Sequence, residues 1–64
     1  MTAGRSDLID IAGEVLAETA KAVLLYDGAR QDWLPKSQIE IDRRADGTVE
    51  VAMPEWLAKA KGFI

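Results

Sequence analysis

Trp33-Leu34-Pro35-Lys36-Ser37-Gln38-Ile39-Glu40-Ile41 is the segment from which the fold of this chain is most readily inferred. Pro35 lacks a backbone donor, so a strand through Trp33 and Leu34 must end there or lie at a sheet edge. Residues 36–38 suit a single tight turn, and residues 39–41 then alternate apolar and polar side chains as a half-buried strand does. Two strands that meet at a tight corner predict a small, strongly bent sheet.

The segments on either side of this corner also read as strands. Residues 22–26 are a continuous apolar run followed by Asp27-Gly28, which indicates a buried strand and a turn. Residues 39–43 and 49–53 alternate apolar and polar side chains, and Ala45-Asp46-Gly47-Thr48 between them is typical of a hairpin turn. The sequence therefore predicts an antiparallel hairpin after the corner.

The C-terminal residues favour a helix over residues 54–61. Pro54 suits the first helical position, and Gly62 provides a C-terminal stop. Trp56, Leu57 and Ala60 are predicted to share the face that covers the sheet, with residues 63–64 extending this cover. Trp56 and Tyr26 are predicted to be core residues, because so small a domain needs its large side chains for burial.

Residues 8–20 fit two structures. A helix would place one set of residues on a common face: Leu8, Ile11, Ala12, Val15, Leu16 and Thr19. A strand would point Ile9, Ile11, Val15 and Ala17 inward and Asp10, Glu14 and Glu18 outward. Gly13 would then mark a bend or bulge. Periodicity alone leaves both structures open.

Length and composition define the class of protein. The 64 residues allow one domain, predicted over residues 7–64 after a loose tail of residues 1–6. A domain of this size buries only about 60% of the surface of its unfolded chain, so a homodimer or another partner would add to a thin core. No segment is long and apolar enough for a membrane span or a signal peptide, which indicates a soluble cytoplasmic protein.

The chain contains no cysteine and no histidine. Disulfides, thiolate or imidazole metal ligands and histidine-based catalysis are therefore excluded. Ser37 has no histidine to activate it, and residues 42–47 place arginines where a calcium loop needs ligands. We expect no enzymatic activity, no metal and no cofactor.

Charge opposes nucleic-acid binding and suits either a basic protein partner or ordinary solubility. Eleven acidic and eight basic residues give a net charge of −3, which opposes binding to phosphate backbones. The predicted partner-binding residues are those of an acidic surface with one aromatic anchor: Asp10, Glu14, Glu18, Asp27, Asp32 and Trp33. The alternative is a binder of single-stranded nucleic acid or nucleotides through Trp33, Lys36, Arg43 and Arg44.

Three segments carry a resemblance to known proteins: Glu18-Thr19-Ala20-Lys21-Ala22-Val23-Leu24, residues 33–39 and Met53-Pro54-Glu55-Trp56-Leu57-Ala58. Together with Lys61-Gly62 they resemble a class of short proteins of phages and other mobile elements. The resemblance implies that residues 8–20 are a strand. It also implies a counter-defence role of the anti-CRISPR type, in which the protein blocks a host CRISPR effector complex.

A second likeness is to SH3-type barrels, where a single turn containing Pro and Ser before the last strand is similar to residues 35–39. The resulting expectation is an α+β domain. It consists of an SH3-like, strongly bent antiparallel sheet of four or five strands and a C-terminal helix. A helix over residues 8–20 is the structural alternative.

Overall fold

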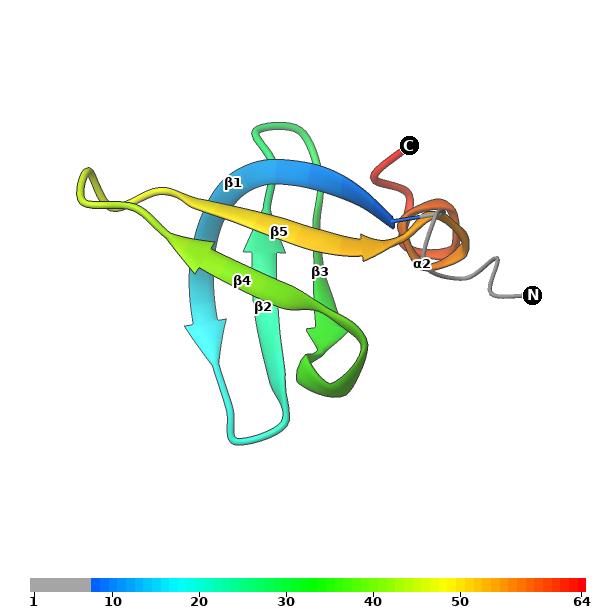
Figure 1. The fold of residues 1–64 in the computed structure, drawn as a ribbon, viewed down its shortest axis with the longest axis horizontal. Helices are drawn as coiled ribbons and strands as arrows, with labels where there is room; N and C mark the ends of the chain where they lie inside the picture. The colour runs from blue at the N-terminus through cyan, green and yellow to red at the C-terminus, as the bar shows by residue number, and fades with distance from the viewer. Residues whose placement is uncertain (1–7) are drawn as a thin grey trace.

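The computed structural model describes residues 8–64, and its main feature is one five-stranded antiparallel sheet followed by a short helix (Figure 1). The strands are β1 (Leu8–Glu18), β2 (Ala22–Tyr26), β3 (Gln31–Pro35), β4 (Glu40–Arg43) and β5 (Val49–Pro54). A 3₁₀ turn, η1 (Lys36–Gln38), joins β3 to β4, and helix α2 (Glu55–Lys61) follows β5. The α+β class and the C-terminal helix are confirmed. The predicted tail of residues 1–6 lies outside the described residues.

Strand β1 holds the sheet together, because the strand order is β3-β2-β1-β5-β4. Its first half pairs with β5, from Leu8↔Pro54 to Gly13↔Val49, and its second half pairs with β2, beginning at Glu14↔Tyr26. The strand arches strongly between the two halves (Figure 1). The prediction of a strand for this segment is confirmed, and the helical alternative is wrong.

Gly13 allows the bend at which β1 changes partner. A Cβ atom on this residue would overlap the backbone carbonyl oxygen of Tyr26, at the end of β2. Only glycine lets the two backbones approach so closely. The predicted bend at Gly13 is therefore confirmed, with a close backbone contact as its cause.

A bulge near the end of β1 changes which side chains face inward. The register shifts between Val15↔Leu25 and Ala17↔Leu24, so Leu16 is an extra residue. Cross-strand partners point to the same face of a sheet. Glu18 pairs with the buried Val23 and thus lies on the inner face, whereas Ala17 lies on the outer face. The predictions for Ala17 and Glu18 are wrong for this reason.

The core lies on the concave side of the sheet and continues under α2. Its buried residues come from β2, β3, β5 and the C-terminal segment: Val23, Leu25, Leu34, Val49, Val51, Met53, Leu57, Ala58 and Phe63. Leu57 and Ala58 are the buried residues of α2, while Trp56 is 59% exposed and Ala60 is also exposed. The predicted inner face of the helix is therefore wrong at these two positions.

The predictions for the residues that end and follow α2 are confirmed only in part. Gly62 ends the helix with a φ of 83°, and its N–H donates to carbonyls of the last turn. Phe63 then folds back into the core, but Ile64 is exposed. Tyr26, predicted to be core, is only partly buried.

The sheet does not close into a barrel. Its two outermost strands are β3 and β4, and no strand pairing joins them in residues 8–64. The SH3-like part of the expected fold is not confirmed. The tight turn at residues 36–38 and the hairpin of β4 and β5 are both present as predicted, with Gly47 at a φ of 92° in the hairpin turn.

Candidate binding surface

The outer side of the sheet carries an acidic surface on the half formed by β1, β5 and β4. Strand pairing places Asp10, Ala52 and Glu40 in one row across the three strands. The next row is Ala12, Glu50 and Asp42. We call these two rows the outer acidic face. Ala12 and Ala52 are small, so the four carboxylates project from the sheet around them.

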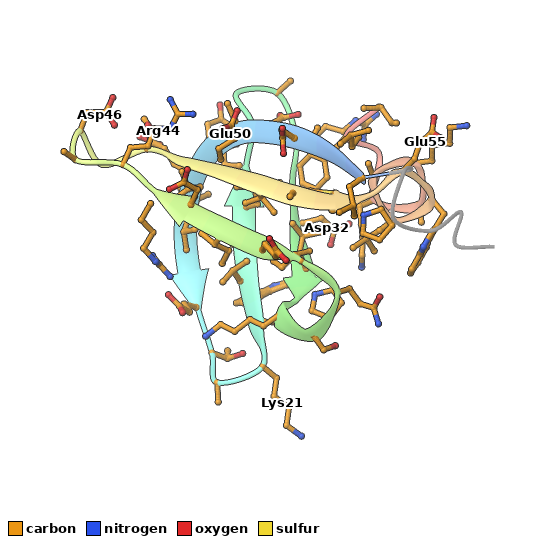
Figure 2. All side chains as sticks on the ribbon, viewed as in Figure 1. Lys21, Asp32, Arg44, Asp46, Glu50 and Glu55 are labelled. Atoms are coloured by element: carbon orange, nitrogen blue, oxygen red, sulfur yellow. The ribbon has the colours of Figure 1, made fainter. Side chains whose placement is uncertain are left out.

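Few cations neutralise this face. Arg44, in the turn after β4, donates to the Glu50 carboxylate at 2.8 Å. Figure 2 shows Arg44 and Glu50 on the side of the turn between β4 and β5, with Lys21 away from them at the turn between β1 and β2. Within residues 8–64, Asp10, Glu40 and Asp42 form no salt bridge. The face therefore keeps most of its negative charge available to a partner.

The acidic residues predicted from the sequence are distributed over several parts of the fold. Asp10 belongs to the outer acidic face, and Glu14 lies on the same side of β1 just beyond the bend. Asp32 pairs with the buried Leu25 and so faces inward, 3.9 Å from the Lys61 ammonium. The five carboxylates thus do not form one surface.

Asp27 has a structural role in the loop between β2 and β3. Its Oδ1 accepts the N–H of Arg30 at 2.7 Å and of Ala29 at 2.9 Å. These backbone hydrogen bonds, led by that of Arg30, lower the pKa of Asp27 below its usual value. The side chain is therefore ionised at neutral pH and holds the loop in place.

Glu18 binds η1 and the last residue of β4 to the end of β1. Its carboxylate lies 2.6 Å from the Lys36 ammonium and 3.1 Å from the Arg43 guanidinium. The hydrogen bonds from Lys36 and then Arg43 lower the pKa of Glu18. This cluster ties together the open edges of the bent sheet, so Glu18 is a scaffold residue.

The same contacts bear on the basic residues considered for nucleic-acid binding. Lys36 and Arg43 are both paired with Glu18, and Arg44 is paired with Glu50. Trp33 lies on the outer face of β3, opposite Leu24, whereas Arg43 lies on the inner face opposite Val49. The structure does not bring these four side chains into one patch.

Trp33 is 40% exposed and has apolar neighbours on the outer face. Ala17, Leu24 and Trp33 form one row across β1, β2 and β3, and Leu16 is 48% exposed at the bulge beside it. The outer side of the sheet thus has an acidic half and an apolar half. Glu40, Asp42 and Glu50 were missed by sequence reasoning, although the alternation of the predicted hairpin places all three on one side.

Two classes of site find no support in the described part of the chain. Residues 8–64 contain no group of three or more carboxylates that could hold a metal ion. No helix in the same range is long and apolar enough to cross a membrane. No family model, curated protein or solved structure matches the chain, so its function must be inferred from this geometry.

Proposed function

We propose that this chain is a non-enzymatic protein-binding inhibitor or adaptor that presents its outer acidic face to a positively charged partner. The observation that carries the proposal is the pair of cross-strand rows, in which three strands bring Asp10, Glu40, Asp42 and Glu50 to one side of the sheet. Regularly spaced negative charges on a fixed surface imitate what a nucleic-acid backbone presents to a protein.

The partner class follows from this charge pattern. Protein channels that hold nucleic acids are lined by arginine and lysine, and a carboxylate-rich sheet can occupy such a channel in place of phosphates. The resemblance to short proteins of phages and mobile elements makes a CRISPR effector complex the first candidate. On this proposal the protein acts by occupying a site that nucleic acid would otherwise fill.

The apolar half of the outer side supplies an anchor for such a complex. Trp33 is partly exposed on edge strand β3, with Leu24 beside it and Leu16 at the bulge. Tryptophan is enriched among the residues that dominate interface energies. Charge would then accelerate the encounter, and Trp33 would slow dissociation.

The test measures the binding of the purified protein to purified, guide-loaded effector complexes by biolayer interferometry. Affinity should fall steeply between about 50 mM and about 300 mM NaCl, because the attraction acts through exposed charges. Glu40→Lys should lower the association rate about tenfold. Glu55→Lys changes the net charge equally but lies on α2, away from the face, and should have little effect.

A competition measurement addresses the mechanism. If the face imitates phosphates, labelled target DNA and the protein should exclude one another from the effector. An absence of binding to every complex tried, or binding that ignores both salt and Glu40→Lys, would remove the charge-mimic proposal.

The rival function, binding of single-stranded nucleic acid or nucleotides, makes a different prediction. Trp33 would stack on bases, so its fluorescence should be quenched saturably by single-stranded DNA. The pairing of Lys36 and Arg43 with Glu18 supports the protein-binding proposal instead, because those cations are already engaged. Saturable quenching that Trp33→Phe abolishes would reverse this choice.

An SH3-type relationship is part of the same proposal. The 3₁₀ turn of residues 36–38 between two strands and the long bent β1 shared by both halves of the sheet support it.

A further inference from the structure

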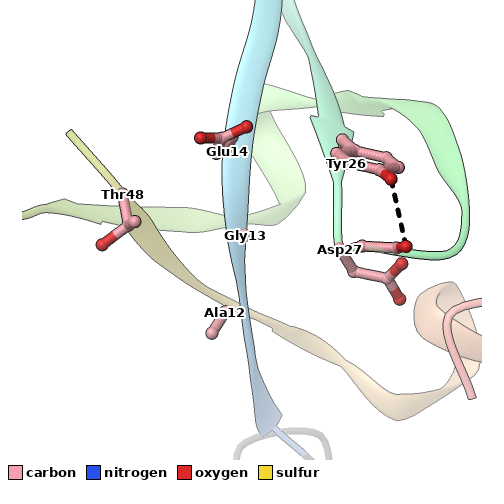
Figure 3. Close-up of a pocket in the computed structure, with 7 residues that line it drawn as sticks. Ala12, Gly13, Glu14, Tyr26, Asp27 and Thr48 are labelled. Carbon is pink, nitrogen blue, oxygen red and sulfur yellow. Dashed lines mark hydrogen bonds between the residues drawn. The ribbon is translucent and has the colours of Figure 1, made fainter.

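A hollow opens on the outer side of the sheet at the bend of β1. Strand β1 leaves β5 after the Gly13↔Val49 pair and joins β2 from the Glu14↔Tyr26 pair, so the two neighbouring strands separate at this point. The hollow has a volume of about 400 Å³ and is lined by Ala12, Gly13, Glu14, Tyr26, Asp27, Gly28 and Thr48 (Figure 3). We call it the Gly13 hollow.

Gly28 leaves one side of this space open, because no heavy atom lies near the position of a Cβ on this residue. Ala12 belongs both to the hollow and to the outer acidic face, where it pairs with Glu50. The hollow is therefore continuous with the surface that we propose as the binding face.

Two carboxylates stand at the hollow, one on each wall. Glu14 comes from β1, and Asp27 comes from the end of β2 on the other side, as Figure 3 shows. Asp27 uses Oδ1 for the loop hydrogen bonds, and no hydrogen bond to Oδ2 occurs among the described residues. Glu14 forms no salt bridge within residues 8–64.

Tyr26 gives the hollow an aromatic wall in a fixed position. Its hydroxyl donates to the Gly28 carbonyl oxygen at 3.0 Å, which holds the ring beside Asp27 (Figure 3). Arg30 is the nearest cation in the chain's own loop, but its guanidinium lies close to Gly62 at the end of α2. Within residues 8–64 no salt bridge brings a cation to Glu14 or Asp27, so the hollow can accept a cation from another molecule.

We propose that the Gly13 hollow takes an arginine side chain of the protein partner. The aliphatic stem would lie against Ala12 and the Tyr26 ring, and the guanidinium would lie between the carboxylates of Glu14 and Asp27. Arginine fits better than lysine, because its planar group stacks on aromatic rings and donates to two acceptors at once. This inference rests on the proposed function and names the residue type that the partner supplies.

The first experiment uses defined peptides and needs no identified partner. The capped tripeptides Gly-Arg-Gly, Gly-Lys-Gly and Gly-citrulline-Gly are titrated into ¹⁵N-labelled protein. The amide signals of Gly13 and Gly28 are then followed by NMR. The arginine peptide should bind saturably with a Kd in the millimolar range, corresponding to about −4 kcal/mol. The lysine peptide should bind at least about threefold more weakly, and the neutral citrulline peptide should give no saturable shift.

Variants locate the site. Glu14→Gln keeps size and exposure and should weaken the arginine peptide about three- to tenfold. Glu55→Gln removes a carboxylate on α2 and should leave the titration unchanged. Equal shifts from all three peptides, or a titration that Glu14→Gln does not alter, would overturn the inference.

Failure of this inference is distinguishable from failure of the proposed function. If the arginine peptide does not bind but Glu40→Lys still weakens the effector complex, the hollow is not a site and the acidic face stands. If the peptide binds as expected but Glu40→Lys changes nothing, the arginine site stands and the proposed function falls.

Discussion

Gly13 is the residue on which the bent sheet most directly depends, because a side chain there would meet the backbone of Tyr26. We expect Gly13→Ala to lower the free energy of unfolding by about 2–3 kcal/mol, as overpacking against a rigid backbone does. Urea unfolding followed by circular dichroism measures this. Gly47→Ala is the matched control, since Gly47 has a φ of 92° but free space around it, and should cost about 1 kcal/mol. An equal or smaller loss at Gly13 would contradict the proposed cause of the bend.

Because of the ion pairs of Glu18, we expect the stability of the protein to fall at acidic pH. Its pKa in the folded protein is lowered from the ordinary value of 4.5, chiefly by Lys36 and then by Arg43. The unfolded chain therefore binds the proton more readily, so stability rises with pH across this interval. The contribution is fully present above about pH 4.5 and is lost as the pH falls through the lower folded value.

The measurement is thermal unfolding of the parent and of Glu18→Gln between about pH 7 and about pH 3. The variant should have a lower Tm at neutral pH and a smaller loss of Tm on acidification. Some acid loss should remain, because the pKa values of Asp27 and Asp46 are also lowered. Lys36→Met tests the same contact from the other side, and its effect should not add to that of Glu18→Gln. An unchanged acid limb would show that the ion pairs do not act in solution.

At the scale of elements, α2 covers the core with two buried residues, and the chain after it adds a third, Phe63. Phe63 is 8% exposed, whereas Trp56 is 59% exposed. Phe63→Ala should therefore lower the free energy of unfolding by about 3 kcal/mol, and Trp56→Ala by less than about 1 kcal/mol. Phe63→Leu, at about 1 kcal/mol, provides a measurable variant if the alanine variant does not fold. The reverse order of the two aromatic residues would contradict the packing of α2.

The elements themselves could be predicted because their signals are local. Pro35, the alternation of the hairpin strands and Gly62 act on their own neighbours and indicate strands, turns and a helix stop. The bulge at Leu16 depends on how β1 pairs with β2, which no local pattern contains. That bulge moves Glu18 to the inner face, so the predicted outward direction of this side chain was wrong.

Which side of α2 is buried could not be predicted from local sequence patterns either. The helix has seven residues, and its rotation is set by where β5 ends and where Phe63 must enter the core. The position of the acidic residues of the β4–β5 hairpin, in contrast, could have been predicted from the sequence. Combining the predicted register of the hairpin with its alternation brings Glu40, Asp42 and Glu50 together.

For the whole molecule, the outer acidic face should weaken the fold while it serves binding. Asp42 and Glu50 are direct cross-strand partners, and like charges at such positions destabilise a sheet. Asp42→Asn should therefore raise the free energy of unfolding by about 0.3–1 kcal/mol. Added NaCl should reduce the difference in the free energy of unfolding between variant and parent, because it screens the repulsion between Asp42 and Glu50.

The same substitution should weaken the proposed complex, so stability and binding move in opposite directions. Asp46→Asn is the control, because it makes the same chemical change four residues away in a side chain that accepts hydrogen bonds from the Thr48 hydroxyl and N–H. It should destabilise the hairpin turn and leave binding unchanged. Urea unfolding and interferometry on the two variants measure both quantities. If Asp42→Asn destabilised the protein as Asp46→Asn does, Asp42 would be a structural residue. Binding of a partner would then no longer be needed to explain why a carboxylate lies opposite Glu50.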